Sequence, residues 1–294
     1  MASEQALSSP PAPRPSRAGR NLPAALAVGL PLVAVVVLTL LYWHWGFVLF
    51  VTVMLAFGTV EVHDALKRIG MKSAIVPIVV GTIAVLAGTY AAATQEGQTN
   101  LPWHSVLLGF LGATTLMALI WRMPGGAAGY VKDAAASLFT ISYIPLLGSF
   151  IGLILASDNG GAKVATALLC VIGADTGGYA IGARWGRHPM APLISPKKSW
   201  EGMIGSVGLA TAVTIPLTVY WLEQPWWVGL ILSLSIVAAA TCGDLIESLI
   251  KRDVGIKDMS SILPGHGGVM DRLDSILVAI PVAWLVLFLL VPSS

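Results

Sequence analysis

Residues 242–275 (CGDLIESLIKRDVGIKDMSSILPGHGGVMDRLDS) hold the densest group of side chains that could do chemistry in this chain. Six of the fifteen acidic residues and four of the seventeen lysines and arginines lie in this stretch. Two long apolar segments flank it, and charge is expensive in hydrocarbon, so the cluster is a functional-site hypothesis. Its charged members are Asp244, Glu247, Asp253, Asp258, Asp271, Asp274, Lys251, Arg252, Lys257 and Arg272.

The acidic residues form two pairs with helical spacing. Asp244 lies seven residues before Lys251, which places it roughly 10 Å inside the preceding apolar segment. Glu247 follows at i+3 and shares its helix face. Asp271 and Asp274 have the same spacing at the start of the next segment, where a helix dipole favours acidic residues. The helix dipole accounts well for one acidic residue at this position but less well for two. It disfavours Asp244 and Glu247, which lie near the C-terminal end of the preceding helix.

Carboxylates that meet between two packed helices need cations. Hard oxygen ligands of this kind favour Mg²⁺, which takes one or two protein carboxylates and completes its shell with water and substrate phosphates. The basic residues would neutralise the remaining phosphate charge. In residues 264–268 (PGHGG), Gly267 and Gly268 would let backbone N–H groups approach an anion. His266 is a candidate proton carrier or phosphate donor, and a plain loop histidine is an equal alternative.

Two motifs outside this stretch extend the candidate site. Asp175 lies nine residues before Arg184, so it should be roughly 13 Å below the membrane surface. It would line a polar cavity or, alternatively, hydrogen-bond to neighbouring helices. Residues 195–202 (SPKKSWEG) suit phosphate oxygens, although a basic loop at the lipid headgroups is the alternative. The substrate-binding candidates are Ser195, Lys197, Lys198, Ser199, Lys257, Gly267 and Gly268.

Composition places these motifs in a helical membrane protein. Hydrophobic residues make up 56% of the chain and charged residues 11%, against roughly 25% charged in ordinary globular domains. Apolar runs near the length of a bilayer-spanning helix recur throughout. Cys170 and Cys242 lack the spacing of a zinc or disulfide framework and are expected to be small buried residues. No Walker A motif or other soluble nucleotide-binding signature is present, and no nucleic-acid partner is expected.

The predicted fold is all-α and polytopic, with nine spans. Residues 1–22 form a Pro-, Ala- and Ser-rich tail expected to be disordered. Residues 23–156 are predicted to be a transmembrane scaffold of five helices, and residues 157–294 a catalytic region of four helices. The spans are 23–42, 45–62, 73–93, 104–121, 134–156, 163–183, 203–221, 226–250 and 273–291.

The positive-inside rule then predicts the orientation. With a cytoplasmic N-terminus, sixteen of the seventeen lysines and arginines lie on the inner side, and Lys163 is the exception. The candidate site would face the cytoplasm, where it can meet both nucleotides and lipid phosphates. At the inner end of the second span, Glu61, His63 and Asp64 are interpreted as a solvated helix end. A metal, basic groups and no activated Ser or Cys together favour phosphoryl or nucleotidyl transfer.

Residues 248–274 closely resemble the signature of the phosphatidate cytidylyltransferase (CDP-diacylglycerol synthase) family. The matched positions include SxIKR, KDxS, LPxHGGV and DRLD. Residues 195–202 and 175–179 (DTGGY) resemble two further family blocks, in which Thr is common at Ser199 and Ala at Gly178. The likeness is good over residues 170–275 and weak over the first five spans.

The resemblance implies the reaction of CTP with phosphatidic acid to give CDP-diacylglycerol and pyrophosphate, with Mg²⁺. It also implies a cytoplasmic polar funnel in a bacterial plasma membrane protein that is often a homodimer, and metal binding by Asp244 and Asp271. Glu247, Asp274 and Asp175 would support the metal. Three alternatives are a CTP-dependent lipid or polyprenol kinase, a secondary transporter with buried carboxylates and a non-catalytic membrane scaffold. The candidate catalytic residues are Asp244, Asp271, Lys251, Arg252, Arg272 and His266.

Overall fold

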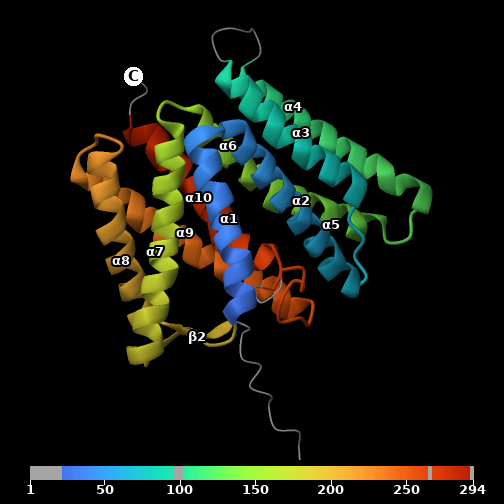
Figure 1. The fold of residues 1–294 in the computed structure, drawn as a ribbon. Coiled ribbons are helices and arrows are strands. Elements are labelled where there is room, and N and C mark those ends of the chain that lie inside the picture. The colour runs from blue at the N-terminus through green and yellow to red at the C-terminus, as the bar shows by residue number, and fades with distance from the viewer. Residues whose placement is uncertain (1–21, 96–101, 264–266, 292–294) are drawn as a thin grey trace, which may run out of the picture.

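The computed structural model describes residues 22–95, 102–263 and 267–291 of the chain. Their fold is a bundle of long helices with one short β-hairpin at one end (Figure 1). The elements in chain order are α1 (Leu22–Tyr42), α2 (His44–Arg68), α3 (Ile75–Thr94), α4 (Trp103–Arg122), η1 (Met123–Gly125), α5 (Tyr130–Ile141), η2 (Ser142–Leu146), α6 (Leu147–Ala156), α7 (Gly160–Trp185), β1 (Pro189–Ala191), β2 (Ser195–Ser199), α8 (Trp200–Tyr220), α9 (Trp226–Asp253) and α10 (Met270–Leu290).

These helices confirm the predicted all-α polytopic fold. Eight helical segments in the described ranges are long and apolar enough to cross a membrane, counting α5, η2 and α6 as one segment. Each corresponds to one of the last eight predicted spans, and α1 coincides with the first. The tail, residues 1–21, lies outside the described part of the chain. The protein is therefore a multi-pass membrane protein.

Several local features differ from the predicted spans. α9 continues to Asp253, so Lys251 and Arg252 lie in its last turn and not in a loop. The segment before α6 is a π-helix that contains Pro145, because proline lacks the N–H of a regular helical hydrogen bond. Residues 189–199 form an antiparallel hairpin, which the sequence pattern did not predict.

Small residues bring the site-bearing helices into close contact. A side chain at Gly177 of α7 would place its Cβ 2.2 Å from the carbonyl oxygen of Gly205 in α8. A Cβ at Gly243 of α9 would lie 2.4 Å from the carbonyl oxygen of Asp274 in α10. Glycine at these positions therefore lets α7 approach α8, and α9 approach α10, backbone to backbone.

Two apolar clusters hold the bundle together. One joins residues of α7, α9 and α10, including Val171, Ile236 and Ile280. The other joins α2, α3 and α5 to the start of α10, through residues such as Leu55 and Met270. In Figure 1 the α3–α4 pair lies on one side of the bundle and α7–α8 on the other, with α9 and α10 between them. The beginning of α10 thus packs against the N-terminal helices.

Candidate functional site

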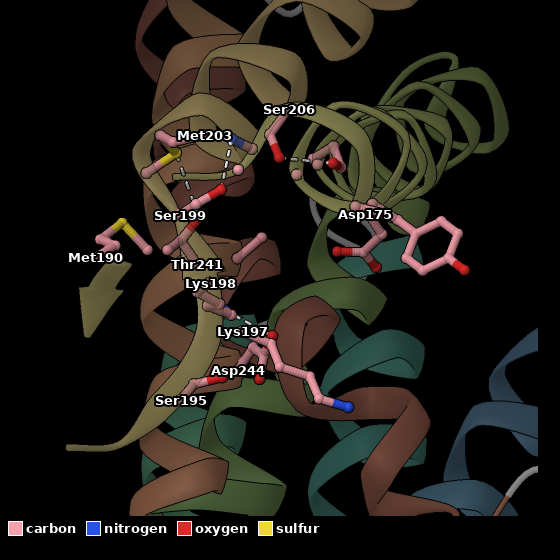
Figure 2. Close-up of a pocket in the computed structure, with 18 of the residues that line it drawn as sticks. Asp175, Met190, Ser195, Lys197, Lys198, Ser199, Met203, Ser206, Thr241 and Asp244 are labelled. Carbon is pink, nitrogen blue, oxygen red and sulfur yellow. Dashed lines mark hydrogen bonds and ion pairs between the residues drawn. The ribbon is translucent and has the colours of Figure 1, made fainter. Parts of the chain in front are cut away.

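A cavity of about 710 Å³ opens among α7, the hairpin, α8, α9 and α10. Figure 2 shows side chains converging on it from different elements, with Asp175 on α7, Lys197 and Lys198 on β2, and Asp244 on α9. The hairpin and the connection from α9 to α10 lie at the same end of the bundle (Figure 1). The lining of the cavity includes the predicted residues Asp175, Ser195, Lys197, Lys198, Ser199, Asp244, Asp271 and Asp274.

The hairpin carries the lysines and is fixed at its junction with α8. Ser199 is the N-cap of α8, and its Oγ accepts a hydrogen bond of 3.1 Å from the Gly202 N–H. The Glu201 carboxylate accepts hydrogen bonds from the backbone N–H groups of Arg187 and His188, and Glu201 Oε1 lies 2.5 Å from His188 Nδ1. These contacts anchor the strand that holds Lys197 and Lys198.

Lys198 links the hairpin to α9. Its Nζ lies 2.6 Å from Oδ2 of Asp244 (Figure 2). Oδ1 of the same carboxylate accepts a 3.3 Å hydrogen bond from Ser248 Oγ one helical turn later, as expected from their i, i+4 spacing. One ammonium of the hairpin and one carboxylate of α9 therefore form an ion pair at the cavity wall.

Asp175 is accessible from the cavity and lies within electrostatic range of Asp244 and Asp274. The sequence left two environments open for Asp175, a polar cavity or hydrogen bonds to neighbouring helices. Its place in the cavity lining favours the first. Three carboxylates from three helices thus border one space, with Lys198 and Arg272 as nearby cations. Carboxylates that border one space repel one another, and a bound cation would relieve this repulsion.

Asp271 is held more firmly than Asp244. Its Oδ1 accepts from Lys251 Nζ at 3.0 Å, and its Oδ2 accepts from the N–H groups of Met259 and Gly268 at 3.0 and 2.8 Å. Lys251 also pairs with Glu247, whose side chain is fully buried. Glu247 and Lys251 do not line the cavity. Lys251 holds Asp271 directly, and Glu247 acts on Asp271 through Lys251.

The remaining predicted residues that the structure describes lie outside the cavity lining. Arg252 and Lys257 are exposed at the end of α9 and in the following loop. Gly267 and Gly268 flank the Asp271 carboxylate, and Gly267 adopts φ = 83°, which favours glycine. Arg272 is in the first turn of α10, within electrostatic range of Asp175. His266 lies outside the described residues.

The interpretation of Glu61 as part of a solvated helix end is wrong. Its side chain is 2% exposed, and its carboxylate accepts hydrogen bonds from Ser260 Oγ and from the backbone N–H groups of Val269 and Met270. Its neighbour Asp64 is exposed, as predicted. The available signal was the absence of a Ser, Thr, Asp or Asn before α10 that could cap that helix.

Comparisons with known proteins cover nearly the whole chain. The chain matches the model of the cytidylyltransferase family over residues 24–290. It is 37% identical over 292 residues to the phosphatidate cytidylyltransferase of Mycobacterium leprae (strain TN), covering 93% of this chain and 90% of that protein. For the phosphatidate cytidylyltransferase of Mycobacterium bovis (strain ATCC BAA-935 / AF2122/97), identity is 38% over 295 residues, with 95% and 92% covered.

A more distant relative matches less of the chain. The phosphatidate cytidylyltransferase of Staphylococcus aureus (strain COL) is 34% identical over 184 residues, which is 61% of this chain and 69% of that protein. The family match, in contrast, includes the N-terminal helices, where the sequence motifs were weakest. A match that runs from α1 to the end of α10, around a cavity of lysines and carboxylates, shows that the chain belongs to the cytidylyltransferase family.

Proposed function

We propose that this protein transfers the cytidylyl group of CTP to phosphatidic acid, giving CDP-diacylglycerol and pyrophosphate for phospholipid synthesis. The observation that carries the proposal is the cavity that places Lys198 and Asp244 in contact beside Lys197 and Asp175. Its volume of about 710 Å³ falls within the usual range of roughly 300–1,000 Å³ for small-molecule sites. The relatives named as phosphatidate cytidylyltransferases support the choice of substrates.

The reaction is a substitution at phosphorus. An oxygen of the lipid phosphate forms a bond to the α-phosphorus of CTP, and the bond between that phosphorus and the oxygen bridging to the β-phosphate breaks. Pyrophosphate leaves with the electron pair of that bond. The lipid phosphate is already anionic near neutral pH, so no general base is required, and catalysis consists mainly of positioning and charge neutralisation.

The basic residues divide this work by position. Lys197 and Lys198 border the cavity from the hairpin and would bind the triphosphate and the lipid phosphate as point charges. Arg272, in the first turn of α10, lies within electrostatic range of Asp175. Phosphate oxygens that bind Lys198 would compete with Asp244 for its ammonium, and this exchange would release an Asp244 oxygen when substrate arrives.

The acidic residues fit Mg²⁺ by their chemistry. Asp175, Asp244 and Asp274 offer hard oxygen donors around one cavity, and these are the ligands that Mg²⁺ prefers. Among the described residues, no three potential metal-ligating side chains are close enough to hold an ion by themselves. This suits an ion that takes one or two carboxylates and completes its shell with water and phosphate. When bound, Mg²⁺ would neutralise charge on the phosphates.

Asp244 is the better candidate for direct binding, because its carboxylate is partly exposed to the cavity. Asp271 is the second candidate, although its oxygens already accept hydrogen bonds from three groups of the chain. We further propose that the protein is a homodimer in a bacterial plasma membrane, with the cavity open to the cytoplasm. Mass measurement of the purified protein in detergent would test the dimer.

A pyrophosphate-release assay on purified protein tests the reaction. With phosphatidic acid present, pyrophosphate is expected with CTP and Mg²⁺ but neither with ATP nor with EDTA. The lipid product should carry cytidine from labelled CTP. Release of CDP in place of pyrophosphate would show a kinase and contradict the proposal. Omission of phosphatidic acid is the control for CTP hydrolysis.

A further inference from the structure

The first turn of α10 has no capping side chain of its own. Its N-cap residue is Val269, which makes no side-chain cap hydrogen bond. Backbone N–H groups at a helix start have no partner within the helix and need one from elsewhere. Glu61 of α2 supplies it, because its Oε1 accepts from the Val269 N–H at 2.9 Å and its Oε2 from the Met270 N–H at 2.7 Å.

The same carboxylate also holds the loop that precedes α10. Ser260 Oγ donates to Glu61 Oε1 at 2.5 Å. Ser260 is 199 positions from Glu61 in the sequence, and Met270 is 209. The carboxylate is buried, and the positive end of the α10 dipole compensates part of its charge. Glu61 therefore ties an N-terminal helix to both ends of this loop segment.

Gly268 connects this contact to Asp271. A Cβ at Gly268 would lie 2.9 and 3.0 Å from the two Glu61 carboxylate oxygens and 3.0 Å from Asp271 Oδ2. The Gly268 N–H itself donates to Asp271 Oδ2 at 2.8 Å. The carboxylates of Glu61 in α2 and Asp271 in α10 thus both accept hydrogen bonds from the backbone of residues 268–270. A shift of that segment would move Asp271 and, one helical turn later, Asp274.

We propose that Glu61 is a positioning residue for nucleotidyl transfer, which caps α10 from α2 and so sets Asp271 and Asp274 at the cavity. This inference rests on the proposed function and gives α2 a direct part in the site. It departs from the expectation that the first five spans act as a scaffold. Glu61 does not line the cavity, so it acts through the α10 backbone.

The test compares E61Q with D64N in the full-length protein. Glu61→Gln keeps the side-chain shape but turns one acceptor oxygen into an N–H₂ group facing backbone donors. Asp64→Asn makes the same chemical change on the exposed face of the same helix. For each variant, amide hydrogen exchange of residues 267–275, melting temperature, kcat and the Mg²⁺ concentration for half-maximal activity are measured.

E61Q is expected to speed exchange at the start of α10 and to raise the Mg²⁺ requirement. It should also lower kcat by about tenfold to 10²-fold, because a mutation far from the reacting atoms that misplaces them by about 1 Å can cost 10²-fold. D64N should match the wild-type protein in all four measurements. Gly268→Ala provides a second variant, because its added methyl group would displace the Glu61 and Asp271 oxygens. Gly268→Ala is expected to show the same effects on exchange and on the Mg²⁺ requirement as E61Q. It therefore provides the test if E61Q folds poorly.

Wild-type exchange and kcat in E61Q would overturn the inference. A fall in activity that only follows a loss of folded protein, with an unchanged Mg²⁺ requirement, would also overturn it. Exchange is measured without substrate, so the contact is tested even if the wild-type protein does not release pyrophosphate from CTP. That outcome would refute the proposed function separately.

Discussion

The carboxylates of the site differ in how firmly the protein holds them. The Asp244 side chain is 36% exposed and contacts Lys198 and Ser248. The Asp271 side chain is 6% exposed and accepts from Lys251 and two backbone N–H groups. A carboxylate with few protein contacts can rearrange around a ligand, whereas one with many contacts also stabilises its surroundings. The two residues should therefore respond differently to the same substitution.

Asp244→Asn and Asp271→Asn are both expected to lower kcat by about 10²–10³-fold, the size typical of losing one preorganised electrostatic group. Only Asp271→Asn should also destabilise the fold, by about 1–3 kcal/mol, because it leaves buried hydrogen-bond partners unsatisfied. Cytidine incorporation into lipid and thermal melts of the purified variants measure the two effects.

Asp253→Asn is the matched control, since Asp253 is exposed at the end of the same helix as Asp244. It should leave activity and melting temperature unchanged. Near-wild-type activity of Asp244→Asn at normal protein levels would contradict the role of Asp244 at the site. Equal melting temperatures for the two active-site variants would contradict the structural role of Asp271.

Helix packing determines the width of the cavity. α7 and α8 approach each other through Gly177 and Gly205, where an added Cβ on either glycine would meet the carbonyl oxygen of the other. The same helices carry Asp175 and border the hairpin. A wider spacing between α7 and α8 would therefore separate Asp175 from the lysines. The packing of small residues and the chemistry of the site are coupled through this distance.

Gly205→Ala is expected to cost about 1–3 kcal/mol of stability, as overpacking does, and to reduce activity. Its Cβ would lie 2.5 Å from the Gly177 carbonyl oxygen and from Ile181 Cγ1. Gly208→Ala, one turn later in α8, meets no atom within 4 Å and should be neutral or slightly stabilising. Melting temperature and pyrophosphate release distinguish the pair. Equal behaviour of the two variants would argue against close α7–α8 packing.

The sequence predicts these elements well where one physical signal dominates. Hydropathy locates the long helices, because a bilayer-spanning segment needs a continuous apolar run. The i, i+4 spacing on one helix brings Asp244 and Ser248 together, and the structure shows a hydrogen bond between them. The hairpin at 189–199 was missed, since Pro189 and Pro196 lie in a short loop without the alternation typical of strands. The role of Glu61 was missed because its partners lie about two hundred positions away in the chain.

At the scale of the whole molecule, lysines and arginines are distributed unevenly between the two ends of the bundle. The hairpin and the α9–α10 connection lie at one end (Figure 1), and they carry Lys197, Lys198 and Lys257. Lys163, the exception to the predicted distribution, is 6% exposed and donates to Ser157 Oγ at 3.2 Å. A buried lysine such as Lys163 counts less toward the membrane orientation of the chain than the exposed lysines of the hairpin and the α9–α10 connection. A cytoplasmic cavity stays a prediction of the positive-inside rule.

Cysteine labelling in intact cells tests that orientation. In a variant with Cys170 and Cys242 replaced by alanine, a cysteine at Leu193 lies in the exposed loop between β1 and β2, and one at Asp158 in the exposed loop between α6 and α7. Because lysines and arginines favour the cytoplasmic side, a membrane-impermeant maleimide should label Asp158→Cys from outside. It should label Leu193→Cys only after the membrane is opened. The reverse pattern would place the cavity on the outer face, away from cytoplasmic CTP, and would contradict the proposed reaction in cells.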